Sequence, residues 1–144
     1  MKKYILATLM LVMFVTLSNA QGIAGVWKTI DDENGKEKSH LELYEQNGKV
    51  YGKIVKLLQV SSDKLCEKCT GDNKNKPLMG MVLLSGLYAK DGMWTGGTIM
   101  DPNKGSNYGC SLWFEQGNSD ILNVRGKHWS GLYRTQKWYR VTGK

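Results

Sequence analysis

The chain has 144 residues, a length that suits one domain, and it contains 17 glycines, five tryptophans and only two prolines. Its 20 lysines and arginines are interspersed with 13 acidic residues, and no run of like charge marks an arm that binds nucleic acid. The glycines and aromatic residues predict tight turns between aromatic-rich strands, which favours an all-β barrel or sandwich over a helical domain.

Residues 1–20 have the features of a cleaved signal peptide. Lys2 and Lys3 form a basic start, residues 5–17 are an apolar run broken only by threonines, and Ser18-Asn19-Ala20 supplies small residues at the cleavage site. The run is shorter than the roughly 20 residues of a transmembrane helix, and none follows it, so we favour cleavage over an N-terminal membrane anchor. We therefore expect export to the periplasm or beyond, a single domain of residues 21–144 and no integral membrane span.

After the signal, the chain consists of short alternating segments separated by turn residues. Asn34-Gly35 and Asn47-Gly48 are the strongest of these turns, because Asn-Gly is the best short hairpin signal. The expected strands are residues 23–30, 39–44, 50–57, 81–88, 93–100, 107–115, 121–126 and 132–141. Consecutive hairpins predict an all-β, eight-stranded antiparallel up-and-down β-barrel, since closure removes exposed sheet edges; a β-sandwich is the alternative. Such a barrel has room inside for side chains or for one small ligand.

A long polar connection, residues 59–78, carries Cys66 and Cys69. In an exported chain, two cysteines this close together are expected to form a disulfide. The alternatives are a redox pair, which needs a basic or helical environment, and a zinc site, which needs four ligands. The two histidines and the third cysteine are too scattered to complete such a site, so no metal is expected. Cys110 is expected to be buried as a small hydrophobe, with intermolecular pairing as the alternative.

The residues of a catalytic site do not stand out. The sequence has no Gly-x-Ser-x-Gly turn for a nucleophile, no glycine-rich loop for phosphate, and only two histidines. Asp101 and Asp120 lie beside turns, where an aspartate ordinarily hydrogen-bonds to the backbone. We therefore expect no catalytic residues, no cofactor and a function other than that of an enzyme.

The last expected strand mixes aromatic and polar residues. By alternation, Arg134, Gln136, Trp138 and Arg140 share one side of it. If that side faces inward, one interpretation is that an arginine stacks on Trp27 and closes one end of the barrel. The other interpretation is that these polar groups line a ligand cavity.

Short motifs follow one another in order along nearly the whole mature chain. They are Gly25-Val26-Trp27-Lys28-Thr29, Gly52-Lys53-Ile54-Val55-Lys56-Leu57, Cys66-x-x-Cys69-x-Gly71-Asp72, Pro77-x-x-Gly80-Met81, Trp94-x-Gly96-Gly97-x-Ile99-x-Asp101-Pro102, Leu122-Asn123-Val124-Arg125-Gly126 and Arg134-Thr135-Gln136-x-Trp138-x-Arg140-Val141. Together they resemble an exported bacterial family, domain of unknown function 2147. Residues 127–131 depart from the glycine-rich link that precedes the last strand in that family.

The resemblance implies an architecture and a location, but no reaction, because the family carries no established activity. Its members look like relatives of the lipocalin and avidin barrels, the calycin type, in which an early Gly-x-Trp packs beside a late arginine. Here the matching residues would be Gly25, Trp27 and either Arg134 or Arg140. We assign the structural role to Gly25, Trp27 and Arg140.

Two functions are compatible with these expectations. The first is a binding module for a small, partly apolar ligand, with Trp94, Tyr108 and Gln136 lining the barrel and Arg134 as an anchor for an anionic group. The alternative is a structural or interaction protein of the cell envelope, with a filled core, no ligand and another envelope protein as its partner.

Overall fold

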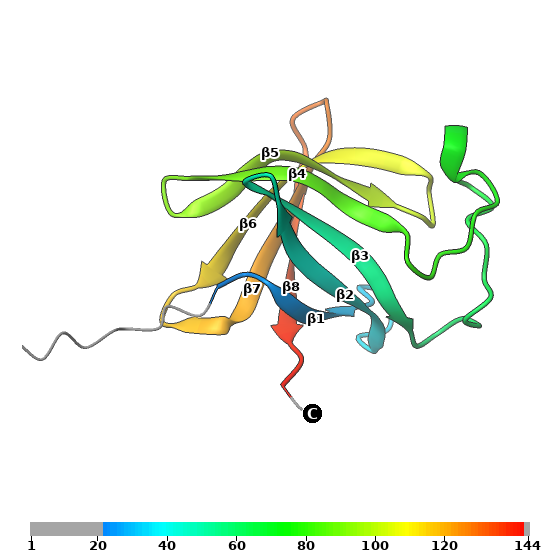
Figure 1. Cartoon of the computed structure of the whole chain (residues 1–144), viewed down its shortest axis with the longest axis horizontal. Helices are drawn as coiled ribbons and strands as arrows, with labels where there is room; N and C mark the ends of the chain where they lie inside the picture. The colour runs from blue at the N-terminus through cyan, green and yellow to red at the C-terminus, as the bar shows by residue number, and fades with distance from the viewer. Residues whose placement is uncertain (1–21, 143–144) are drawn as a thin grey trace, which may run out of the picture.

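The computed structural model describes residues 22–142, so the expected signal peptide lies outside the described residues. The strands are β1 (Gly25–Ile30), β2 (Glu37–Gln46), β3 (Lys49–Leu57), β4 (Val82–Lys90), β5 (Met93–Asp101), β6 (Ser106–Glu115), β7 (Asn118–Lys127) and β8 (Tyr133–Arg140). Each strand pairs antiparallel with its neighbours in sequence, and the pairing of β1 with β8 closes the barrel (Figure 1). The predicted eight-stranded up-and-down barrel is therefore confirmed, and the sandwich alternative is wrong.

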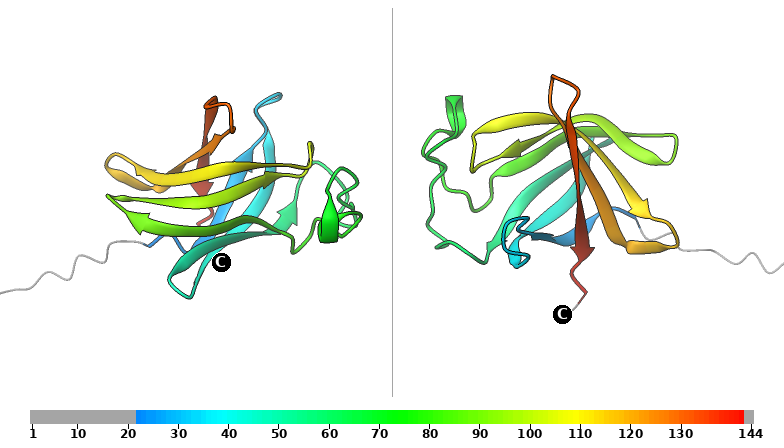
Figure 2. Two further views of the ribbon diagram at one scale, coloured as in Figure 1. Left: turned by 90° about the horizontal axis from the view of Figure 1, so that it is seen from above. Right: turned by 180° about the vertical axis from the view of Figure 1, so that it is seen from behind.

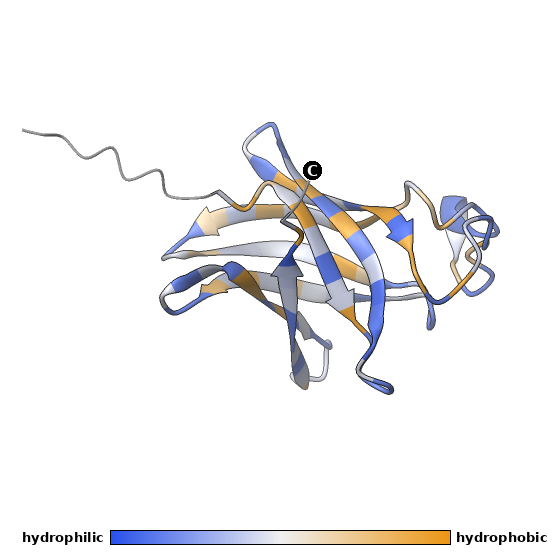
Figure 3. Ribbon diagram, turned by 90° about the horizontal axis from the view of Figure 1, so that it is seen from below, coloured by the Kyte–Doolittle hydropathy of each residue, from blue (hydrophilic) through white to orange (hydrophobic). Residues whose placement is uncertain are grey.

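Alternation along the strands builds the core. On β6, Cys110 and Leu112 are buried, and Phe114 packs against the core on the same side of the strand. Figure 3 shows hydrophobic and hydrophilic residues alternating along several strands, as is typical of a sheet with one buried face. The hairpin between β2 and β3 turns at Asn47 and Gly48, which both have positive φ (53° and 74°), the conformation that makes Asn-Gly favourable there.

The barrel closes along a short seam. Strands β1 and β8 are joined through only two residue pairs, Trp27 with Arg140 and Lys28 with Tyr139. Every other pair of neighbouring strands shares a longer ladder of residue pairs. Backbone pairing is therefore least extensive where the first and last strands meet.

The connection between β3 and β4 contains one turn of 3₁₀ helix, η1 (Gly71–Asn73), and lies at the side of the barrel (Figures 1 and 2). It carries the expected disulfide between Cys66 and Cys69, and both sulfur-bearing residues are buried. Met100 of β5 is buried beneath this connection, which we call the disulfide loop. Among the described residues, no helix is long and apolar enough to cross a membrane.

Candidate functional site

One end of the barrel is filled by aromatic side chains. Trp27 is fully buried, and its indole N–H donates a hydrogen bond to the carbonyl oxygen of Ile23 at 2.9 Å. The Trp27 ring stacks on Phe114, with ring centroids 6.3 Å apart, and Phe114 meets the edge of Trp94 at 5.3 Å. We call this end, with its three packed rings, the filled end of the barrel.

Arg140 covers the filled end. Its guanidinium lies 4.3 Å from the centroid of the Trp27 ring, and only 6% of its side chain is exposed. It donates hydrogen bonds to three backbone carbonyl oxygens at 2.9–3.3 Å and pairs with Asp120 at 3.1 Å. Arg140, rather than Arg134, therefore lies beside Trp27, where it connects the start of the chain's first strand with β7 and β8.

The opposite end of the barrel has partly exposed side chains on its inner face. Ile99, Tyr108 and Gly126 are neighbours on the inner face of β5, β6 and β7. A Cβ atom added to Gly126 would lie 3.5 Å from Cβ of Tyr108 and 3.7 Å from Cγ2 of Ile99. Ile99 and Tyr108 are nevertheless only half-buried, whereas Leu112, further along β6, is completely buried. Solvent therefore reaches the inner wall at this end.

Strand β8 adds a polar rim to this partly exposed end. Arg134 pairs with Gly126 in the sheet, which places Arg134 and Gln136 on the inner side of the strand. The Arg134 guanidinium forms an ion pair with Asp32 at 2.5 Å, and the amide of Gln136 donates to the same carboxylate. The indole N–H of Trp138 donates to the Gln136 side-chain oxygen at 3.4 Å. We call this end of the barrel the barrel mouth; its residues are Asp32, Ile99, Tyr108, Gly126, Arg134 and Gln136.

Of the four side chains that we expected to line a cavity, the structure brings three together. Tyr108, Arg134 and Gln136 belong to the barrel mouth, whereas Trp94 lies at the filled end. Asp32 was not expected at this site, because it is 104 residues away from Gln136 along the chain and has no local sequence signal. Gly126 was not expected there either, since its only sign in the sequence is a glycine inside an expected strand.

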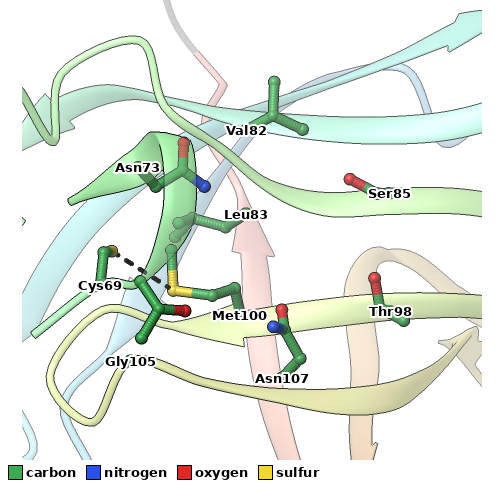
Figure 4. A pocket seen from close by; sticks show the side chains of 10 residues that line it. Cys69, Asn73, Val82, Leu83, Ser85, Thr98, Met100, Gly105 and Asn107 are labelled. Atoms are coloured by element: carbon green, nitrogen blue, oxygen red, sulfur yellow. Dashed lines mark hydrogen bonds between the residues drawn. The ribbon is translucent and has the colours of Figure 1, made fainter. Parts of the chain in front are cut away.

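A second hollow lies outside the barrel, between the disulfide loop and the outer face of β4, β5 and β6 (Figure 4). This outer cleft has a volume of about 140 Å³, and none of its lining side chains is charged. Hydroxyl and amide groups alternate there with apolar groups; they belong to Asn73, Ser85, Thr98, Asn107, Leu83 and Met100. An adjoining, more open depression of about 520 Å³ continues along the same loop.

The turn between β5 and β6 fixes the position of the disulfide loop. Gly105 has a positive φ of 67°, and a Cβ atom there would lie 1.8 Å from the carbonyl oxygen of Lys68. Beside this contact, the Cys69 sulfur lies 4.0 Å from the sulfur of Met100 (Figure 4). The shape of the outer cleft therefore depends on a close contact that only glycine allows.

The titratable groups do not gather into a reactive centre. Burial raises the pKa of the Cys110 thiol to about 12, so this thiol is protonated at neutral pH and is a poor nucleophile. Burial also lowers the pKa of His40, and the nearby Lys56 lowers it further. His128 lies far along the chain, in the turn after β7, where its ring nitrogen bonds to Ser130. Within residues 22–142, no three or more His, Cys, Asp or Glu side chains are grouped closely enough to hold a metal ion.

Comparisons with known proteins agree with this architecture. Protein HP1028 from the human pathogen Helicobacter pylori, described as a member of the lipocalin family, matches with a TM-score of 0.72. The two chains are 23% identical, and the match covers 84% of each, which shows a shared fold. The chain matches none of the curated proteins with which it was compared. The family model described as "Uncharacterized protein conserved in bacteria (DUF2147)" matches residues 25–140, from the first strand to the last, and the chain therefore belongs to this family.

Proposed function

We propose that this protein is an exported binding module that holds a small, partly apolar molecule in the barrel mouth and acts by binding rather than by catalysis. The observation that carries the proposal is the partly exposed inner face around Gly126, where polar groups of β8 lie beside Tyr108 and Ile99. At the other end, Trp27 is completely buried beneath Arg140 and packs on Phe114, so the protein's own rings occupy the interior there. At the mouth, side chains that point inward are still reached by solvent.

The side chains of the mouth suggest how such a molecule would be held. Tyr108 and Ile99, which are paired across β5 and β6, offer an aromatic ring and an aliphatic surface beside Gly126, which has no side chain. Gln136 and the ion pair between Arg134 and Asp32 offer polar groups at the rim. An apolar body would therefore lie against Tyr108, with its polar end toward β8. Because Asp32 already neutralises Arg134, the rim favours a neutral or weakly polar group over a strongly anionic one.

The residues of the expected signal peptide and the disulfide support export. Disulfides form and persist in oxidising compartments, and the loop that contains Cys66 and Cys69 is closed by one. Fractionation of the native cells, followed by N-terminal sequencing, tests this part of the proposal. We expect a mature chain outside the cytoplasm that begins at Gln21; an uncleaved chain in the cytoplasm would contradict it.

Filling the mouth tests the binding site directly. Gly126→Leu extends a side chain between Tyr108 and Ile99, where the first added atom makes only ordinary contacts of 3.5–3.9 Å. Gly109→Leu is the matched control, because Gly109 lies on the outer face of β6 and an added Cβ would meet only one atom, 3.7 Å away. The probe is N-phenyl-1-naphthylamine, a neutral apolar fluorophore, and native mass spectrometry of the protein mixed with envelope lipid extracts identifies natural candidates.

We expect the wild type and Gly109→Leu to bind the probe equally and Gly126→Leu to bind it at least about tenfold more weakly. Near-ultraviolet circular dichroism checks that both variants keep native packing. Equal binding by all three proteins would show that the mouth is not the site. A wild type that binds neither probe nor lipid would favour the alternative of a structural or interaction protein with no ligand.

A further inference from the structure

The turn between β7 and β8 projects beyond the neighbouring strands (Figures 1 and 2), and it carries large apolar side chains that are exposed. Trp129 is 91% exposed, Leu132 76% and Tyr133 63%, and these are the most exposed large hydrophobic residues among those described. Single exposed apolar side chains are common on protein surfaces. Three within five residues of one projecting turn form an apolar patch, and such patches often mark a site that binds another molecule. We call residues 127–134 the β7–β8 tip.

The tip is held in shape by its own hydrogen bonds. The backbone N–H of His128 donates to the carbonyl oxygen of Leu132 at 2.7 Å, and that of Gly131 donates to His128 at 2.9 Å. The Ser130 hydroxyl lies 2.8 Å from the His128 ring nitrogen. Because the turn is already ordered, contact with a partner would cost little further loss of conformational freedom.

Basic residues surround the apolar patch. From residue 121 to the last residue of the chain there is no aspartate or glutamate. Lys127 lies opposite Tyr133 in the sheet and forms no ion pair among the described residues. The Arg125 guanidinium stacks over the Tyr133 ring at 4.2 Å. Asp32 reaches this hairpin from the turn after β1, but it is paired with Arg134.

We infer that the β7–β8 tip docks the protein on the surface of a lipid bilayer that contains anionic lipids. Tryptophan and tyrosine are enriched at the level of the lipid headgroups, and an inserted leucine is stabilised by the acyl boundary below. Lys127 and Arg125 would lie beside the anionic headgroups, which attract basic side chains next to a membrane. The patch is the end of a narrow hairpin, so it suits shallow insertion. A second copy of this chain is a poorer occupant, because it would bring the two basic tips together.

Docking of the tip would place the barrel mouth near the membrane. Gly126 of the mouth directly precedes the tip, Arg134 of the mouth is the tip's last residue, and the rings of Tyr108 and His128 are 6.2 Å apart. The docking inference itself does not rest on the proposed ligand site, because the side chains that carry it are outside the mouth. The two proposals therefore succeed or fail separately.

Cosedimentation with sucrose-loaded vesicles tests the inference. Vesicles of phosphatidylcholine with about 30% phosphatidylglycerol are compared with vesicles of phosphatidylcholine alone, in low and in high salt. The test variants are Trp129→Ser/Leu132→Ser and Lys127→Glu. The matched control is Leu58→Ser/Val60→Ser, which removes two exposed apolar side chains (37% and 47% exposed) from another surface.

We expect the wild type and the Leu58/Val60 control to bind the anionic vesicles equally. Trp129→Ser/Leu132→Ser should bind at least about tenfold more weakly, because burial of the indole and leucine side chains is lost. Lys127→Glu should weaken binding mainly in low salt, where charges are least screened. Gly126→Leu, which fills the mouth, should bind the vesicles as the wild type does.

Three results would overturn the inference. A wild type that stays in the supernatant with anionic vesicles in low salt would show that the tip does not bind lipid. Equal sedimentation of the wild type and Trp129→Ser/Leu132→Ser would place the lipid contact elsewhere. Size-exclusion chromatography is the third measurement: a wild-type dimer that becomes a monomer in Trp129→Ser/Leu132→Ser would show that the tip contacts a second copy instead.

Discussion

Replacing Arg140 with alanine should lower the free energy of unfolding more than replacing any exposed charged residue does. The side chain is only 6% exposed and lies 4.3 Å from the centroid of the Trp27 ring. A cation–π contact of this kind contributes about 1–2 kcal/mol when shielded from water, and a charged hydrogen bond about 1.5–3 kcal/mol. The ion pair with Asp120 adds little, since 53% of that carboxylate side chain is exposed.

These contributions overlap, so we expect Arg140→Ala to lower the free energy of unfolding by about 3 kcal/mol. Urea denaturation followed by tryptophan fluorescence, under conditions that keep the disulfide closed, measures this loss. With a denaturant slope of about 2 kcal/mol per molar, the urea midpoint should fall by about 1.5 M. Arg140→Lys should recover part of the loss, because it keeps the charge but not the planar fork of donors.

Arg134→Ala is the matched control for Arg140→Ala. It removes the same group from the same strand, but the Arg134 side chain is 64% exposed and its contact is an ion pair with Asp32 at the rim. Exposed ion pairs contribute at most about 1 kcal/mol, so we expect a much smaller change in the midpoint. Equal midpoints for Arg134→Ala and Arg140→Ala would refute the argument that the guanidinium stabilises the filled end.

Three further predictions concern the core and the disulfide loop. In the native protein at pH 8, iodoacetamide should leave Cys110 unmodified, because burial raises the pKa of its thiol to about 12. The same thiol should react at once in protein unfolded with urea. Detection of alkylated Cys110 in native protein by mass spectrometry would contradict this prediction. Replacing Cys66 and Cys69 with alanine should lower the free energy of unfolding by only about 2 kcal/mol, because the loop that the disulfide closes is small. Probe binding at the barrel mouth should stay unchanged. Loss of probe binding would show that the disulfide loop supports the mouth. Trp27→Phe should lower the free energy of unfolding, measured by urea denaturation, by about 2–3 kcal/mol, since it removes the hydrogen bond to Ile23 and leaves a void beneath Arg140. A decrease below about 0.5 kcal/mol would show that the Trp27 ring is not tightly packed.

The order of the strands and the side chains that face inward were predictable from the sequence, because both depend on local patterns. The Asn-Gly at residues 47–48 makes its hairpin through the backbone conformation of those two residues alone. Strict alternation likewise placed Cys110 and Leu112 on the inner face of β6. The pairing of Cys66 with Cys69 followed from their short spacing and the expected export.

The rest depended on contacts that no local pattern reports. A β-bulge between Trp94 and Gly97 shifts the alternation on β5, so Met100 faces the disulfide loop instead of the interior. The disulfide loop itself has no periodicity, and its buried residues are recognisable only once it is packed on the barrel. Asp32 joins the mouth through a contact with β8, far along the chain.

The short seam between β1 and β8 has a mechanical consequence. Two residue pairs form that joint, whereas Arg140 reaches across it to carbonyl oxygens on both sides. The circumference of the barrel is therefore held there by a short backbone ladder, extended by the Val141 N–H bond to the carbonyl oxygen of Val26 at 2.8 Å, together with one side chain. When the native protein opens locally, the pairing of β1 with β8 should separate first. The backbone amide hydrogens of Lys28 and Tyr139 should therefore exchange with solvent deuterium sooner than those of β6. Loss of the Arg140 side chain should therefore loosen the barrel wall first along this seam.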